Sequence, residues 1–166
     1  MKIGIAGLGK MGTNHLNELR KDDEFKVAAL YDLRQNAEFK EPFYTNLDEF
    51  LKANLDIVII ATPTSTHLEL AKAILAKVKC VLIEKPLAMN LKEMNEIKEL
   101  AKKHESSVVV GFSERFNPAI LALKKELANE KIISINIKRY SPFPARISDV
   151  GILQDLSIHD IDLVGF

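Results

Sequence analysis

The sequence predicts an α/β protein with a doubly wound parallel sheet, followed by the start of a second α/β domain. Short apolar runs rich in β-branched residues alternate with helical patterns, which is the sequence order of parallel strands covered by helices. The runs are almost continuously apolar, as strands buried on both faces should be. The pattern changes after Gly111, so we expect a first domain over residues 1–116 and an incomplete second one over residues 117–166.

The apolar runs give the predicted strands, and polar residues between them give the predicted helix starts. The strands are expected at Ile3–Ala6, Val27–Tyr31, Phe43–Thr45, Ile57–Ala61, Val81–Ile83 and Val108–Val110. Asn46, Thr66 and Asn90 each precede a glutamate by three residues, which is the spacing of a capping box at a helix N-terminus. We therefore expect helices to follow each of these three residues.

The second domain is predicted from a different pattern. Asn117 and Pro118 are typical of a helix cap and a first helical residue, with the helix running to about Asn129. The alternation of apolar and polar residues over 133–138 predicts a half-buried strand, and another helix is expected from Asp155. Because a lone strand is not stable by itself, we expect either a fragment of a longer chain or partner strands from another subunit.

Composition limits the classes of function. Lysine plus arginine and aspartate plus glutamate balance at 23 each, so no bulk charge favours nucleic acid or an anionic membrane. The single cysteine, Cys80, excludes an intramolecular disulfide and fits a reducing compartment. No apolar run has the length of a membrane span or a signal peptide. We expect a soluble, cytoplasmic protein that acts on a small molecule and binds neither nucleic acid nor membrane.

A glycine-rich turn directly follows the first strand and precedes a helix. In this Gly-x-Gly-x-x-Gly pattern, Gly7 would allow the tight turn, Gly9 would let a pyrophosphate approach the backbone, and Gly12 would let the helix pack closely. The phosphates would then lie at the positive end of the helix that begins at Lys10 and Met11. The alternative is a glycine-rich turn in an unrelated α/β domain, but the strand and helix on either side favour a dinucleotide site.

An acidic residue predicts which dinucleotide binds. The second strand ends in Asp32, which lies 20 residues after Gly12, where an acid can hold both hydroxyls of a ribose. A carboxylate would repel a 2′-phosphate, so NAD is predicted and NADP is disfavoured. Arg34 lies two residues further on and could partly neutralise that repulsion.

Four further segments resemble the glucose–fructose oxidoreductase / inositol dehydrogenase (Gfo/Idh/MocA) family. They are Ala61-Thr-Pro63-x-x-x-His67, Glu84-Lys85-Pro86, Gly111-Phe-Ser-Glu-Arg115-Phe-Asn-Pro118 and Gly151-x-x-x-Asp155-x-x-x-His159-x-x-Asp162. The resemblance implies an NAD(P)-dependent oxidoreductase that forms a homo-oligomer. It also implies a Rossmann domain followed by an α/β domain with a large, open, predominantly antiparallel sheet, most of which these 166 residues lack.

The Glu84-Lys85-Pro86 segment follows a buried strand, and ligands bind at the carboxyl ends of parallel strands. The resemblance implies that Lys85 holds the substrate oxygen as charge develops on it; the alternative is a solvated lysine. The cofactor groove is expected to include Thr62, Pro63, His67, Glu84 and Lys85. For His67 a satisfied core histidine is the alternative. His15 is expected to pack its helix and not to contact the cofactor.

Asp155 and His159 are four residues apart, so they share one face of a helix. Imidazole is suited to taking a hydroxyl proton, and the resemblance implies that His159 is the general base or acid with Asp155 beside the sugar hydroxyls. The alternatives are a helix cap with an exposed histidine, or a metal-binding pair. No third ligand has metal-site spacing, so we predict no metal. Asp162 could orient His159 or be solvated.

The loop over 139–152 resembles more narrowly the UDP-N-acetylglucosamine 3-dehydrogenases. Arg139 and Arg146 in this loop could bind a diphosphate or be solvated, and Arg146 is assigned to the substrate. The sequence thus predicts an NAD-dependent oxidoreductase that takes a hydride from a secondary hydroxyl of a sugar, at C3 of a UDP-amino sugar. The alternative is a truncated NAD-binding module without turnover, with a binding or regulatory role.

Overall fold

The structure is a computed structural model that describes residues 1–34, 38–138, 140, 151 and 156–166. The chain divides into two compact units, Met1–Gly111 and Phe112–Phe166. The division falls ahead of residue 116 because the short helix over Ser113–Phe116 packs with the helices that follow it.

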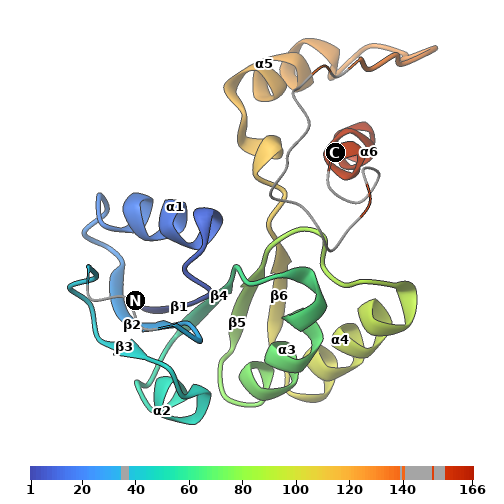
Figure 1. The fold of residues 1–166 in the computed structure, drawn as a ribbon. Coiled ribbons are helices and arrows are strands. Elements are labelled where there is room, and N and C mark those ends of the chain that lie inside the picture. Colours follow the sequence, from blue (N-terminus) through green and yellow to red (C-terminus); the bar gives the residue numbers. More distant parts are fainter. Residues whose placement is uncertain (35–37, 139, 141–150, 152–155) are drawn as a thin grey trace. The chain divides into compact units, whose positions relative to one another are not determined.

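The first unit is built on a parallel sheet. Its strands are β1 (Lys2–Ala6), β2 (Lys26–Tyr31), β3 (Phe43–Tyr44), β4 (Ile57–Ile60), β5 (Cys80–Ile83) and β6 (Ser107–Val110). Their order across the sheet is β3-β2-β1-β4-β5-β6, and every neighbouring pair is parallel (Figure 1). The predicted doubly wound Rossmann sheet is confirmed, with each strand close to its expected position.

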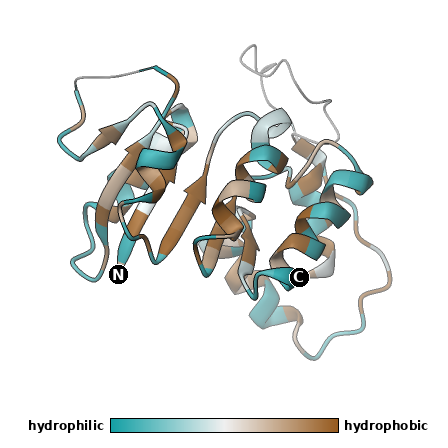
Figure 2. Cartoon of the chain, turned by 90° about the horizontal axis from the view of Figure 1, so that it is seen from below, coloured by the Kyte–Doolittle hydropathy of each residue, from teal (hydrophilic) through white to brown (hydrophobic). Residues whose placement is uncertain are grey.

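Helices cover both faces of this sheet. They are α1 (Lys10–Leu19), α2 (Leu47–Leu51), the short η1 (Thr64–Thr66), α3 (His67–Leu75) and α4 (Leu91–Lys103). Side chains alternate between the faces of a strand, so Ile59 of β4 joins the apolar cluster under α1, whereas Ile60 joins the cluster under α2, α3 and α4. Apolar strands and helices of mixed polarity are visible in Figure 2.

Asparagine side chains cap two of the three helix starts predicted in the first unit. The side chains of Asn46 and Asn90 each accept a hydrogen bond from the backbone N–H three residues later, at 3.1 and 3.0 Å. The predicted helix start after Thr66 is also confirmed, because α3 begins at His67, but the Thr66 side chain does not cap it. Its hydroxyl donates to the carbonyl of Pro63 at 2.7 Å, because the tight turn of η1 comes before α3 and places that carbonyl within reach.

The second unit consists of helices in the part that the structure describes. They are η2 (Ser113–Phe116), α5 (Pro118–Leu127) and α6 (Ile158–Gly165). Asn117 caps α5 as predicted, accepting from the N–H of Ala119 at 3.0 Å. The predicted strand over 133–138 is not formed, because the described residues of this unit offer no second strand to pair with it. Ile133 is accordingly 93% exposed, and a sheet in this unit stays a prediction.

Candidate functional site

The carboxyl ends of the strands bring several of the predicted residues to one edge of the sheet. Because all strands are parallel, the residues that follow β1, β2, β4 and β5 lie along the same edge. β1 and β4 are neighbours, and the chain continues outward from them in opposite directions, to β2 and to β5. Such a switch point is where ligands bind in open α/β sheets.

The three glycines of the first turn meet different surroundings. Gly7 has φ +91°, and a Cβ there would lie 2.7 Å from the carbonyl carbon of Ala61. A Cβ at Gly12 would lie 1.8 Å from the carbonyl oxygen of Gly7, so α1 packs directly on the turn. A Cβ at Gly9 would meet nothing within 4 Å. The turn therefore needs glycine at two positions for its own geometry and is open to a ligand at the third.

The N-terminus of α1 has no side chain closing it. The N-cap residue is Gly9, no side chain caps the helix, and its first turn contains no acidic residue. Lys10 is exposed and Met11 is half-buried. The first N–H groups of a helix have no partner within the helix and lie at the positive end of its dipole. This end of α1, next to the open space at Gly9, fits a pyrophosphate.

Asp32 is held against the glycine turn. One carboxylate oxygen accepts from the N–H of Leu8 at 2.7 Å, and the other accepts from the N–H of Arg34 at 3.3 Å. A carboxylate offers about four lone-pair positions, so both oxygens can still accept from ribose hydroxyls. The side chain of Arg34 is exposed. Together with the glycine turn, the fixed and half-buried Asp32 fits the adenosine half of a dinucleotide.

His67 is a buried residue that contacts the backbone at this edge of the sheet. The residue is 1% exposed, and its Nε2 lies 3.0 Å from the carbonyl oxygen of Thr62. Its Nδ1 lies 3.1 Å from the carbonyl oxygen of Pro86. Thr62 is half-buried and Pro63 is exposed. His67 therefore connects the ends of β4 and β5 through their backbones, and its ring has no surface to present to a cofactor.

Glu84 has a partner that sequence reasoning missed. It is buried, and one of its carboxylate oxygens lies 2.6 Å from Nε2 of His15 on α1. Lys85, the next residue, is half-buried. His15 was expected only to pack its helix. Its partner lies 69 positions away in the sequence, so no local pattern could have revealed the pair.

In the second unit, α6 carries His159 next to an aromatic ring and an ion pair. The rings of Phe112 and His159 meet edge to face, with centroids 6.4 Å apart. Arg115 donates two hydrogen bonds to Asp162, at 2.7 and 2.5 Å, and the bond raises the pKa of Arg115. Asp162 therefore pairs with Arg115 and is not simply solvated, because its side chain is 10% exposed; its role in orienting His159 stays a prediction.

Three of the predicted site residues fall outside the part of the chain that the structure describes, namely Asp155, Arg139 and Arg146. Among the residues that are described, no three histidine, cysteine or acidic side chains gather as a metal site would require. Within the same residues, no helix has the length and apolar character needed to cross a membrane.

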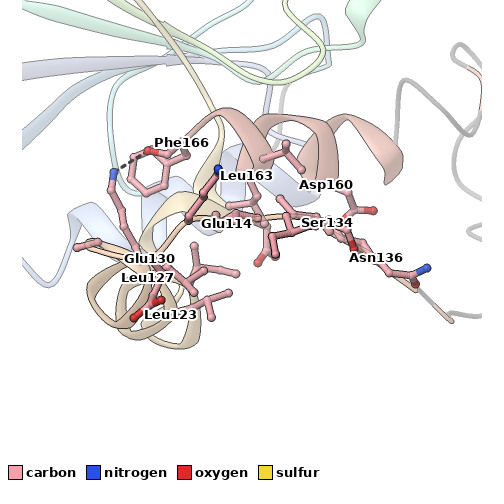
Figure 3. A pocket seen from close by; sticks show the side chains of 18 residues that line it. Glu114, Leu123, Leu127, Glu130, Ser134, Asn136, Asp160, Leu163 and Phe166 are labelled. Atoms are coloured by element: carbon pink, nitrogen blue, oxygen red, sulfur yellow. Dashed lines mark hydrogen bonds between the residues drawn. The ribbon is translucent and has the colours of Figure 1, made fainter.

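The second unit also has a hollow of about 1010 Å³ between α5, residues 130–137 and α6 (Figure 3). Apolar side chains such as Leu123, Leu127 and Leu163 line much of it. Lys124 donates to the carbonyl of Phe166 at its margin, at 2.7 Å. None of the predicted site residues lines this hollow, so we distinguish it from the polar edge of the sheet in the first unit.

Comparisons with known proteins agree with this geometry. The family described as an oxidoreductase family with an NAD-binding Rossmann fold matches residues 1–112. The myo-inositol 2-dehydrogenase of Thermotoga maritima is 32% identical over 100% of this chain and 54% of its own length. The UDP-N-acetylglucosamine 3-dehydrogenase of Acidithiobacillus ferrooxidans is 31% identical over 98% of this chain and 53% of its own.

A solved structure is similar over nearly the same span. The crystal structure of myo-inositol 2-dehydrogenase from Lactobacillus plantarum has a TM-score of 0.84 and 28% identity, covering 99% of this chain and 55% of that one. The chain spans about half the length of the curated relatives it matches.

Proposed function

The chain belongs to the Gfo/Idh/MocA oxidoreductase family and has its NAD-binding Rossmann fold, and from that premise we propose that the protein is an NAD-dependent dehydrogenase of a secondary hydroxyl on a sugar or sugar alcohol. The observation that carries this proposal is the open glycine turn at Gly9 with Asp32 bonded to its backbone. The names of the relatives, which are dehydrogenases of inositol and sugar hydroxyls, support turnover over a module that only binds NAD.

Each part of the turn has a role in binding the cofactor. The N–H groups at Lys10 and Met11 bind the pyrophosphate next to Gly9, and Asp32 accepts from the ribose hydroxyls. Arg34 lies beside that ribose, and the groove continues along Thr62, Pro63 and Glu84. When bound, the nicotinamide ring supplies the acceptor for the hydride.

Three residues are proposed to act on the substrate. The ammonium group of Lys85 donates to the hydroxyl oxygen and stabilises the negative charge that develops there. The imidazole of His159 removes the hydroxyl proton. Asp155 accepts from a neighbouring hydroxyl and orients the sugar. These roles rest on the motifs that contain the three residues.

A UDP-amino sugar oxidised at C3 is the proposed substrate, with Arg146 binding its diphosphate. The relative from A. ferrooxidans supports this class, whereas the relative from T. maritima supports inositol. We further propose that residues 117–166 begin a substrate domain whose open sheet also forms the interface of a homo-oligomer. Assays with UDP-N-acetylglucosamine and with myo-inositol distinguish these two substrates.

The cofactor step is tested by titrating the chain with NADH and NADPH while following nicotinamide fluorescence. We expect saturable binding that favours NADH. Asp32→Ala should weaken NADH binding at least about tenfold, because it removes hydrogen bonds to a charged group, while NADPH binding changes less. Asp23→Ala, at an exposed acid in the same unit, is the matched control. A preference for NADPH, or an unchanged affinity of the Asp32 variant, would contradict the proposal.

A further inference from the structure

The carboxylate of Glu84 is buried directly before the lysine proposed to contact the substrate. Its side chain is only 8% exposed, and a buried charge requires a compensating partner. His15 supplies it at 2.6 Å, with a ring that is itself 25% exposed. A carboxylate only accepts hydrogen bonds, so Nε2 of His15 is the donor. The bond joins the middle of α1 to the end of β5.

Two further contacts fix the position of Glu84. A Cβ at Gly111 would lie 3.0 Å from the carboxyl carbon and from both carboxylate oxygens, so the group lies flat against the backbone after β6. The N–H of Glu84 donates to the carbonyl of Ile60 at 2.9 Å. The side chain is therefore held by α1 and by the end of β6, and the backbone is held by β4.

The residue after Lys85 is also anchored. The carbonyl oxygen of Pro86 lies 3.1 Å from Nδ1 of the buried His67, at the start of α3. Lys85 thus lies between two residues that are each held by a histidine, one from α1 and one from α3. Of these two histidines, only His15 is connected to the glycine turn, because it belongs to α1, the helix whose N-terminus lies at Gly9.

We propose that His15 is a positioning residue, which through Glu84 fixes the backbone at Lys85 relative to α1. One rigid connection then fixes the distance between two groups. These are the N-terminus of α1, proposed to bind the pyrophosphate, and Lys85, proposed to bind the substrate oxygen. This inference deepens the proposed function, and the role of Lys85 in it rests on that function. The link through Glu84 is a separate claim, which can be tested without any ligand.

Amide hydrogen exchange of the ligand-free chain tests the link. His15→Ala and Glu84→Ala should accelerate exchange at the amides of segment 84–87, which are those of Glu84, Lys85 and Leu87 because Pro86 has no N–H. We expect at least about a tenfold increase, since each variant breaks a buried charged hydrogen bond. Glu84→Gln should stay within about threefold of the wild type, because its amide oxygen still accepts from His15. Asn17→Ala, at an exposed position of the same helix, should change nothing at these residues.

The strand amides of β1 and β4 provide the internal reference. A residue that only stabilises the fold would accelerate exchange in the strands and at 84–87 alike, whereas a positioning residue changes 84–87 alone. Unchanged exchange at 84–87 in His15→Ala, or equal acceleration in β1 and β4, would overturn the proposal.

Adding NADH separates this inference from the proposed function. In the wild type, NADH should shift the amide resonance of Lys85, and His15→Ala should reduce that shift to less than about half while NADH still binds. A full shift in His15→Ala would overturn the coupling. Failure of the wild type to bind NADH would overturn the proposed function, while the exchange pattern without ligand would still decide the role of His15.

Discussion

At the scale of single residues, an added methyl group would meet different surroundings at each glycine of the turn between β1 and α1. At Gly12 it would overlap the carbonyl oxygen of Gly7, at 1.8 Å. Backbone atoms cannot move aside as the end of a flexible side chain can, so the helix itself would have to shift. At Gly9, where φ is −68° and the space is open, an alanine can be accommodated by the protein alone.

Substitution by alanine should therefore affect the stability of the fold at Gly12 and the binding of the ligand at Gly9. Gly12→Ala should lower the free energy of unfolding by about 3 kcal/mol or more, at the upper end of overpacking effects. Gly9→Ala should change it by less than about 1 kcal/mol. The same Gly9 variant should weaken NADH binding at least about tenfold, because its methyl group occupies the space proposed for the pyrophosphate. Urea denaturation and NADH titration of both variants check this, and equal stability of the two would contradict it.

At the scale of elements, an ion pair ties the end of α1 to the segment before β3. Arg20 donates to both carboxylate oxygens of Glu41, each at 2.8 Å, which is the strong two-bond geometry. The hydrogen bond from Arg20 holds the pKa of Glu41 below its ordinary value of 4.5. A lowered carboxyl pKa stabilises the fold above the unfolded value, and that stabilisation is lost as the pH falls through the folded value.

We therefore predict that Glu41→Gln lowers the free energy of unfolding by about 0.5–1 kcal/mol at pH 7, the size expected for a partly exposed pair. Below the folded pKa of Glu41 the wild type and the variant should converge, because the protonated carboxyl group resembles the amide. Urea denaturation between neutral and acid pH measures the difference. Glu18→Gln, in an exposed pair with Lys21, should show a smaller effect, and a difference that grows on acidification would refute the assignment.

A second pair holds α6 within the second unit. Arg115 lies over the rings of Phe112 and Phe166, at 5.3 and 5.1 Å from their centroids, while it binds Asp162. The ring of Phe112 in turn meets His159. The pair therefore fixes the helix that carries the proposed base, and its loss should loosen that helix without affecting the sheet of the first unit.

Asp162→Asn tests this assignment. We expect faster amide exchange in α6 and unchanged exchange in β1, because the variant removes the charge that Arg115 binds with two hydrogen bonds. Glu126→Gln, which removes an exposed negative charge from α5 in the same unit, is the control. Equal effects of the two variants on α6 would show that the loss of one negative charge, and not of the pairing with Arg115, loosens this helix.

At the scale of the whole molecule, local patterns predicted the sheet and the edge at which the candidate site lies, but not the contacts that hold that edge together. Apolar runs such as Ile57–Ile60 indicate buried strands wherever they occur, and parallel strands bring their carboxyl ends together. The bond between His15 and Glu84 joins α1 to the end of β5 across 69 positions of the sequence, which no local pattern contains. The alternation over 133–138 forms no strand within the described residues, because a strand requires a partner that local sequence does not specify.

The distribution of the core leads to a last prediction, on the independence of the first unit. Both apolar clusters of the described chain lie within it, from Ile3 to Val108, and so does the complete order of the sheet. The glycine turn and Asp32 lie there as well. A fragment of residues 1–111 therefore has its own core and every group proposed to bind the adenosine half of NAD.

We expect this fragment to unfold cooperatively in urea and to bind NADH within about threefold of the affinity of the whole chain, since distant and independent parts contribute nearly additively. The fragment carrying Asp32→Ala is the control that ties any binding to the same site. A folded fragment that binds NADH much more weakly would show that residues after Gly111 contribute to the cofactor site. A fragment that fails to fold would contradict the independence of the first core.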